Sequence, residues 1–335
     1  MQAQDRAAIY ARTLDRQALH LIILPTEKCN FRCTYCYEDF LIGNMKRELI
    51  DGIKNLLMAR VEDVSAFSIS WFGGEPLLTL NSIIEINHHC MNLIVDKPGA
   101  SFTSDITTNG FLLTEDVFLK LIAAQVQSFQ ITLDGPAPIH DLTRIRKDRS
   151  GTFEVIWRNL LSIASHAHSD ESWNVTLRLH YDAETIDHLE PLVDDICSKL
   201  IPTGRFNVHF HSIEKLGGAN DGAIKSATKE HHQRAKGLRD KIARVTESES
   251  TSLAAAIENY VCYAAKANSL LIRADGRIGK CTVALSDPRN DIGQLHPDGT
   301  LALKGDRIAP WLRGIASGNK SELACPLRSL PALVS

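Results

Sequence analysis

The sequence predicts an α/β fold, a partial (β/α)6 TIM-like barrel followed by a small C-terminal domain, on three observations. Strand-like and helix-like segments alternate about six times between residues 18 and 212. Short strands separated by glycine turns replace this pattern from about residue 255. The length of 335 residues suits one large domain and one small domain. About six strand–helix units predict a parallel sheet with right-handed crossovers that closes only partly, which leaves one side open to a large substrate.

The barrel strands are predicted from short apolar or alternating segments. The first, 20–24, is mostly aliphatic and ends at Pro25, and the second, 67–71, alternates apolar side chains before the break at Gly73 and Gly74. The other four strands are expected at 102–107, 129–133, 175–180 and 206–211. Polar motifs follow several of these strands, and sites in barrels of this type gather at the carboxyl ends of the strands.

Helices are predicted between the strands from apolar residues at helical spacing and from end signals. They are expected at 49–61, 84–95, from 114 onward, 153–164, 185–200 and 228–245. Thr114 is a good N-cap, whereas Pro191 obscures the start of the helix predicted at 185–200. Short strands are expected at 270–273, 279–283 and 300–303. The predicted domains are an N-terminal extension at 1–17, the barrel at 18–212, a linker and helix at 213–254, and the small domain at 255–335.

Composition narrows the class of protein. Hydrophobic residues make up 44% and charged residues 23% of the chain, as in ordinary globular proteins. The net charge of -3 argues against a nucleic-acid-binding surface, and the first residues lack the apolar core of a signal peptide. No apolar stretch there is long enough to cross a membrane. Eight cysteines without a secretory signal are expected to be thiols or metal ligands in a reducing cytoplasm, with Cys90 and Cys197 as buried thiols.

The most specific motif is a group of cysteines in the loop after the first strand. Cys29, Cys33 and Cys36 have the spacing C-x3-C-x2-C, with Tyr35 directly before the last. Three thiolates can each bind one iron of a 4Fe–4S cluster and leave the fourth iron open to a small chelating molecule, whereas ferredoxin clusters use four cysteines. Zinc and a purely structural cluster are the alternatives, but zinc sites prefer C-x2-C pairs and four ligands.

This loop resembles the cluster loop of the radical S-adenosylmethionine (SAM) superfamily. The resemblance implies that the three cysteines hold a 4Fe–4S cluster, that SAM binds its open iron, and that Tyr35 shields the cluster or packs near the adenine. The residues that resemble SAM-binding motifs follow the next strands. They are Gly73, Gly74, Glu75 and Pro76 for the methionine amine, Thr108, Asn109, Thr132 and Asp134 for the ribose, and Arg144 for the carboxylate, with Arg178 a lesser candidate.

Three further cysteines, Cys262, Cys281 and Cys325, lie in the last quarter of the chain. A hairpin turn at Asp275 and Gly276 can fold Cys281 back towards Cys262. The pattern resembles the opening of the SPASM and twitch domains that carry auxiliary clusters in radical SAM enzymes. A full SPASM domain has more cysteines and holds two clusters, so this shortened version implies one auxiliary 4Fe–4S cluster. Plain buried thiols are the alternative.

The resemblance implies reductive cleavage of SAM and hydrogen abstraction from a ribosomally synthesised peptide, followed by formation of a thioether, C–C or ether crosslink. The expected partners are a precursor peptide and a reductant such as flavodoxin or ferredoxin. Because the cluster loop begins about 28 residues into the chain, peptide recognition is expected from a separate protein or an exposed barrel strand. Sulfatase maturation, small-molecule dehydrogenation and an electron carrier without turnover are the alternatives. No catalytic acid or base is assigned, although Glu38 and Asp39 lie near the cluster loop.

Overall fold

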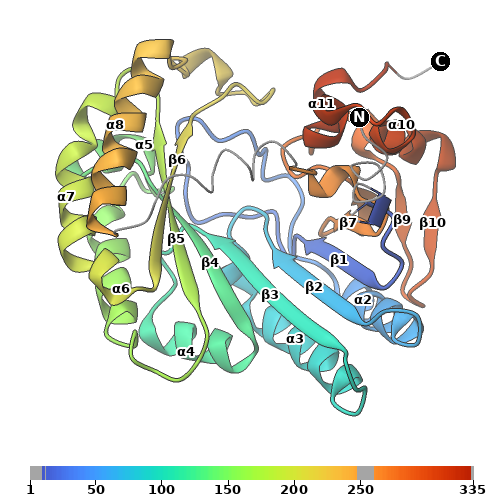
Figure 1. Cartoon of the computed structure of the whole chain (residues 1–335). Helices are drawn as coiled ribbons and strands as arrows, with labels where there is room; N and C mark the ends of the chain where they lie inside the picture. The colour runs from blue at the N-terminus through green and yellow to red at the C-terminus, as the bar shows by residue number, and fades with distance from the viewer. Residues whose placement is uncertain (1–9, 12, 247–259, 333–335) are drawn as a thin grey trace.

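The computed structural model describes residues 10–11, 13–246 and 260–332. Within these ranges the chain forms a ten-stranded sheet in the order β10-β9-β8-β7-β1-β2-β3-β4-β5-β6, with helices packed along the outside of its curved parallel part (Figure 1). Much of the predicted extension at 1–17 and the end of the predicted linker at 247–254 lie outside the described residues. The same is true of 255–259 and 333–335 in the predicted small domain.

Six parallel strands form the barrel part of the sheet. They are β1 (Ala18–Ile23), β2 (Ala66–Trp71), β3 (Ser101–Thr108), β4 (Val126–Leu133), β5 (Asn174–Tyr181) and β6 (Phe206–Ser212). Each strand pairs in parallel with the next one along the chain. The prediction of an α/β fold with a partial (β/α)6 TIM-like barrel is therefore confirmed.

The connections between these strands are helical, as parallel pairing requires. The connecting helices are α2 (Arg47–Arg60), α3 (Leu80–Ile94), α4 (Glu115–Ala123), α5 (Ala137–Thr143), α6 (Phe153–Ala164) and α7 (Glu190–Lys199), and α8 (Lys229–Val245) follows β6. Thr114 caps α4 as predicted. The helix predicted from residue 185 starts later, because a 3-10 turn precedes it and Pro191 occupies its first turn, where the missing N–H costs nothing. No helix in the described ranges is long and apolar enough to cross a bilayer.

The two faces of the parallel sheet differ in polarity. Side chains facing the helices are almost completely buried, among them Leu21, Ile69, Ile106, Ile131 and Leu177. The alternate positions, on the inner face, are polar and include Ser70, Asp105, Gln130, Thr132, Arg178 and His211. Parallel strands are usually apolar on both faces, so this alternation indicates an inner face that is available to water or to a ligand.

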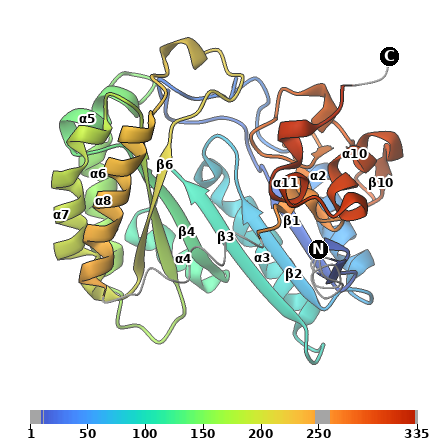
Figure 2. The same cartoon turned by 45° about the horizontal axis from the view of Figure 1, so that its top comes forward.

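The C-terminal strands extend the same sheet beyond β1 (Figure 2). β7 (Ser269–Ile272) pairs in parallel with β1, and β8 (Arg277–Gly279), β9 (Gly293–Leu295) and β10 (Leu301–Leu303) continue the sheet antiparallel. Two short helices follow, α10 (Gly305–Ser317) and α11 (Lys320–Ala324). The sheet thus runs unbroken into the part predicted as a small domain, and the boundaries of that domain stay a prediction.

The short strands predicted in this part are only partly confirmed. Those at 270–273 and 300–303 correspond to β7 and β10, whereas β9 was not predicted. The strand predicted at 279–283 is wrong beyond Gly279. There the side chain of Asn290 accepts hydrogen bonds from the backbone N–H groups of Lys280 and Cys281, so these residues have no strand partner.

A chain of polar side chains links four neighbouring strands on the inner face. His20 of β1 contacts Ser70 of β2 through Nε2 at 2.9 Å and Ser269 of β7 through Nδ1 at 3.0 Å. Ser70 donates to Asp105 of β3 at 2.6 Å, so it accepts a hydrogen bond from His20. Burial, with smaller contributions from Lys266 and Lys280, lowers the pKa of His20 to about 4.

The lowered pKa of His20 predicts a loss of stability in acid. Between pH 6.5 and about 4 the unfolded chain binds a proton at His20 that the folded chain does not bind. The free energy of unfolding should therefore fall as the pH falls, by up to about 1.4 kcal/mol per pH unit from this group. Urea unfolding of H20Q over the same pH range should show a shallower dependence than the wild type. Parallel curves for the two proteins would contradict this account.

Candidate active site

A cavity of about 690 Å³ collects residues from the carboxyl ends of several barrel strands and from both groups of cysteines. Its lining includes most of the residues that the sequence singled out. They are Cys29, Cys33, Tyr35, Cys36, Gly73, Gly74, Thr108, Asn109, Thr132, Arg144, Arg178 and Cys325. The described residues that line the cavity do not include Glu75, Pro76, Asp134, Cys262 and Cys281. Glu75 and Asp134 bond to lining residues, and Cys262 and Cys281 directly precede two others, Tyr263 and Thr282.

The loop that carries the first cysteines is packed tightly against the segment after β2. Gly73 has a φ of +114°, and a Cβ at this position would lie 2.3 Å from the carbonyl oxygen of Thr26. A Cβ on Gly74 would lie 2.4 Å from the carbonyl oxygen of Lys28. The two glycines are therefore required for close contact between two backbone segments. This contact fixes the cluster loop at the edge of the cavity.

Glu75 anchors the same segment to the end of β3. Its buried carboxylate accepts hydrogen bonds from the Thr108 hydroxyl at 2.8 Å, the Asn109 N–H at 2.8 Å and the Leu77 N–H at 3.0 Å. Asn109 in turn places its side-chain amide 3.9 Å from Sγ of Cys29. The observed contacts of Glu75 are thus internal, and its predicted contact with the SAM amine stays a prediction.

Tyr35 is the centre of a buried polar group beside the cysteines. Its hydroxyl donates to Asp134 at 3.0 Å and accepts a hydrogen bond from Arg144 at 2.8 Å. Nδ1 of His180 lies 3.2 Å from the same oxygen. Nε of Arg144 is buried and has no hydrogen-bond partner within the described residues. Arg144 thus lines the cavity and has an unused donor, so it is a candidate for binding an anionic group.

Three thiols line one wall of the cavity, and their chemistry suits an iron–sulfur cluster. Burial raises the pKa of Cys29 and Cys33, and that of Cys36 to about 12, so these thiols ionise readily only beside a bound cation. Among the described residues, no three His, Cys, Asp or Glu side chains converge closely enough to hold a single metal ion. A cubane binds each cysteine to a different iron, so the three thiols need not converge on one point. The donor set is therefore compatible with a 4Fe–4S cluster.

The C-terminal cysteines lie near one another, although they are far apart in the sequence. The backbone N–H of Cys262 donates to Leu323, two residues before Cys325, at 2.9 Å. Burial is the main reason that the pKa of Cys281 rises to about 11, and the charges of Cys262 and Cys325 contribute to the rise, as expected for thiols in one neighbourhood. The predicted set of tail ligands is thus brought together, and its occupation by a cluster stays a prediction.

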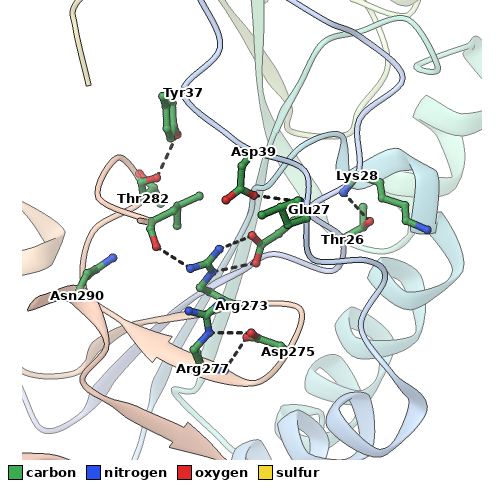
Figure 3. Close-up of polar contacts among 12 residues, drawn as sticks. Thr26, Glu27, Lys28, Tyr37, Asp39, Arg273, Asp275, Arg277, Thr282 and Asn290 are labelled. Carbon is green, nitrogen blue, oxygen red and sulfur yellow. Dashed lines mark hydrogen bonds and ion pairs between the residues drawn. The ribbon is translucent and has the colours of Figure 1, made fainter. Parts of the chain in front are cut away.

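One hydrogen bond connects the two groups of cysteines, and two further contacts join segments of the C-terminal group. Each contact involves a residue that directly follows a cysteine: Tyr37 after Cys36, Tyr263 after Cys262, and Thr282 after Cys281. The Tyr37 hydroxyl donates to the carbonyl of Thr282 at 3.1 Å (Figure 3). The Tyr263 hydroxyl lies 2.7 Å from Oγ1 of Thr282 and accepts from its backbone N–H at 3.0 Å.

A buried ion pair holds the same two regions together. Glu27, two residues before the first cysteine, accepts two hydrogen bonds from Arg273 at the end of β7, at 2.6 and 3.0 Å (Figure 3). Only 3% of the Glu27 side chain and 10% of the Arg273 side chain are exposed. Arg273 also donates to the carbonyl of Leu285 at 2.6 Å. The C-terminal strands therefore support the cluster loop directly.

Breaking this pair should be strongly destabilising. In R273M the Glu27 carboxylate would stay buried without its partner, and we expect the free energy of unfolding to fall by about 3–5 kcal/mol. R277M is the matched control, because Arg277 pairs with Asp275 at the surface and its loss should cost less than about 1 kcal/mol. The double variant E27Q/R273M should recover part of the loss. Equal effects of R273M and R277M in chemical unfolding would contradict a structural role for the buried pair.

Several cavity residues were not assigned from the sequence. His180 of β5 and His209 and His211 of β6 line the cavity beside Arg178, and Glu38 lines it near the cysteines. Burial is the main reason that the pKa of Glu38 rises to about 8, and the charge of Glu27 adds to this. The sequence contains a pattern that could have identified the histidines. They occupy alternate positions in two predicted strands, and alternate positions lie on one face of a sheet.

Comparison with known proteins identifies the class. A family model described as the radical SAM superfamily matches residues 23–196, about half of the chain and nearly all of the barrel. The chain therefore belongs to the radical SAM superfamily, a family that binds a 4Fe–4S cluster and SAM. A cysteine-type anaerobic sulfatase-maturating enzyme of Clostridium novyi is 28% identical over 161 residues, which are 43% of this chain and 40% of that protein. The chain spans less than half the length of the curated relatives that it matches.

Solved structures share the fold over most of the chain. Native anSMEcpe with bound AdoMet and Kp18Cys peptide superposes with a TM-score of 0.63 at 18% identity, over 87% of this chain and 80% of that one. Streptococcus suis SuiB bound to the precursor peptide SuiA superposes with a TM-score of 0.59 at 17% identity, over 89% of this chain and 66% of that one. At these identities the likeness shows the fold alone, and it extends beyond the barrel into the C-terminal strands.

Proposed function

We propose that this chain cleaves SAM with a 4Fe–4S cluster held by Cys29, Cys33 and Cys36, and that it installs a side-chain crosslink in a ribosomally synthesised peptide. The observation that carries the proposal is the 690 Å³ cavity, which is bordered by these three cysteines, by Cys325 and by the polar inner face of the barrel. A cavity of this size is in the range of sites for small molecules and cofactors. The cavity continues along the inner face of the sheet as far as β6, which leaves room for part of a peptide.

The chain's own residues have distinct tasks in this proposal. When bound, the cluster and SAM supply a 5′-deoxyadenosyl radical that abstracts hydrogen from a C–H bond. In this proposal Arg144, which donates to the Tyr35 hydroxyl, is assigned to the SAM carboxylate, and Thr108, Asn109 and Thr132, which line the cavity, are assigned to the ribose. Asn109 also directs its amide at Cys29. The burial of these groups keeps water away from the reacting atoms.

The peptide substrate is supported by solved structures of similar fold that contain a bound peptide. Cys262, Cys281 and Cys325 are proposed to hold one auxiliary 4Fe–4S cluster, because three neighbouring thiols suffice for one cubane with an open fourth ligand. A flavodoxin or ferredoxin is the proposed reductant, and a separate protein or a barrel strand recognises the peptide. Sulfatase maturation is the second candidate, supported by the relative from Clostridium novyi.

The test uses the anaerobically reconstituted protein with SAM, a reductant and a precursor peptide encoded beside its gene. The proposal predicts a peptide product lighter by two hydrogens, with the new bond located by fragmentation in a mass spectrometer. Conversion of a cysteine or serine to formylglycine in a sulfatase peptide, without change to the precursor peptide, would favour the second candidate. Turnover of neither peptide would favour a small-molecule substrate.

Removal of Arg144 should weaken SAM binding without loss of iron. R144A removes a charge-assisted hydrogen bond to the SAM carboxylate, which predicts a loss of about 1.5–3 kcal/mol in binding free energy. R146M is the matched control, because Arg146 is two residues away and its side chain is 41% exposed. SAM affinity measured by equilibrium dialysis and iron content should separate the two variants. Loss of iron in R144A would show that Arg144 is structural.

A further inference from the structure

Arg178 of β5 is a cation without an acidic partner at the wall of the cavity. Among the described residues its side chain forms no ion pair and no hydrogen bond, and its Nε is buried. The charge of Glu214 acts on Arg178, but Glu214 is exposed and forms no ion pair with it. Arg178 is half-buried and lines the cavity, so its guanidinium loses part of its hydration without gaining an acidic partner, and an anionic ligand would supply that partner.

Three histidines surround Arg178 on the same face of the sheet. Strand register places His209 beside Arg178 and His211 beside His180. The ring centroids are 5.6 Å apart for His180 and His211, and 6.0 Å apart for His209 and His211. Burial and the charge of Arg178 lower the pKa of all three histidines. They are therefore neutral near pH 7 and can donate an N–H to a ligand without adding a repelling charge.

SAM accounts for only one of the two arginines in the cavity. It has a single carboxylate, and under the proposed function Arg144 binds it, next to Tyr35 and the cluster loop. Arg178 lies on the inner face of β5, close enough to Tyr35 and Arg144 for their charges to act on it, and the strand order places β5 and β6 at the opposite end of the sheet from the C-terminal strands (Figure 1). Because the single SAM carboxylate is assigned to Arg144, a second anion at Arg178 is assigned to the substrate.

We propose that Arg178, with His209 and His211 beside it, binds a carboxylate of the peptide substrate. A guanidinium matches a carboxylate with two parallel hydrogen bonds, which fixes the orientation of the ligand as well as its position. The bound carboxylate, from an acidic side chain or the peptide C-terminus, would place a neighbouring C–H bond in the cavity that the three cysteines border. This inference rests on the proposed function, since it assumes a peptide substrate.

The test is calorimetric titration of the reconstituted, SAM-saturated full-length protein with a glutamate-containing tripeptide blocked at both ends and with its glutamine counterpart. We expect the glutamate peptide to bind about tenfold more tightly. R178Q should abolish this preference, and R178K, which keeps the charge, should retain part of it. R244Q is the matched control, since Arg244 is exposed on α8 and bonds only to its own helix. Equal binding of the two peptides to the wild type, or an unchanged preference in R178Q, would overturn the proposal.

Two further probes separate the alternatives. Inorganic phosphate that binds at Arg178 more tightly than the glutamate peptide would overturn the carboxylate assignment in favour of a phosphorylated substrate. If glutarate bound in an Arg178-dependent way and neither peptide bound, Arg178 would still be an anion site, but the ligand would not be a peptide. That result would contradict the proposal. A loss of SAM affinity in R178Q as large as that in R144A would show that Arg178 binds SAM, and the proposal would then be wrong.

Discussion

Replacement of Cys29, Cys33 or Cys36 by alanine is expected to abolish SAM cleavage. Each thiolate binds a different iron in the proposed cluster, so the loss of one leaves a cubane with two protein ligands and two open irons. Such a cluster is unstable and cannot present a single open iron to SAM. The iron content should fall by about four atoms per chain. The readouts are iron content and 5′-deoxyadenosine formed after reduction with dithionite.

The control for these variants is C197A. Cys197 lies on α7, is only partly buried and does not line the cavity, so its loss should change neither readout. Each variant must also keep the fold, which circular dichroism can verify. If any one of the three alanine variants still cleaved SAM at the rate of the wild type, these cysteines could not be the cluster ligands.

Simultaneous replacement of Cys262, Cys281 and Cys325 by alanine should have a different effect. The wild type is expected to hold about eight irons per chain, and the triple variant about four. SAM cleavage should persist because the first cluster has its own ligands, whereas peptide modification should fail because the oxidation of the substrate would have no electron acceptor. The measurements are iron content, 5′-deoxyadenosine and peptide product in the same samples.

The wild-type iron content also separates the rival functions. About four irons per chain would show that the tail cysteines are structural thiols, as their burial alone would allow. About twelve would require ligands other than cysteine for a third cluster, and would favour sulfatase maturation, for which two auxiliary clusters are expected.

Much of the fold could be predicted because each barrel strand carries its own local signal. The predicted boundaries of the six barrel strands differ from the observed boundaries by at most three residues. The boundaries of α6 are those that its apolar face predicts. β9 and α5 are short and lack a strong period, so they were missed. The parallel pairing of β7 with β1 was also missed, because it joins segments about 250 residues apart and depends on which edge of the sheet is free.

The site could be predicted only where its residues form local motifs. Cys29, Cys33, Gly73 and Asn109 each belong to a short recognisable segment, and the structure brings them to one cavity. The contacts that support these residues are not local. Glu27 meets Arg273 and Tyr37 meets Thr282 only after folding, and neither partner carries a signal of its own. The sequence predicts that Glu75 faces a ligand, whereas its observed bonds are to the backbone and to Thr108. These bonds depend on how the ends of β2 and β3 lie relative to each other, and the sequence does not reveal this.

The central claim is that this chain cleaves SAM reductively, and one measurement tests it most directly. The anaerobically reconstituted wild-type protein is incubated with SAM and dithionite, and the products are quantified by liquid chromatography and mass spectrometry. The account predicts 5′-deoxyadenosine and methionine in equal amounts. A protein that incorporates iron and binds SAM but forms no 5′-deoxyadenosine would contradict it.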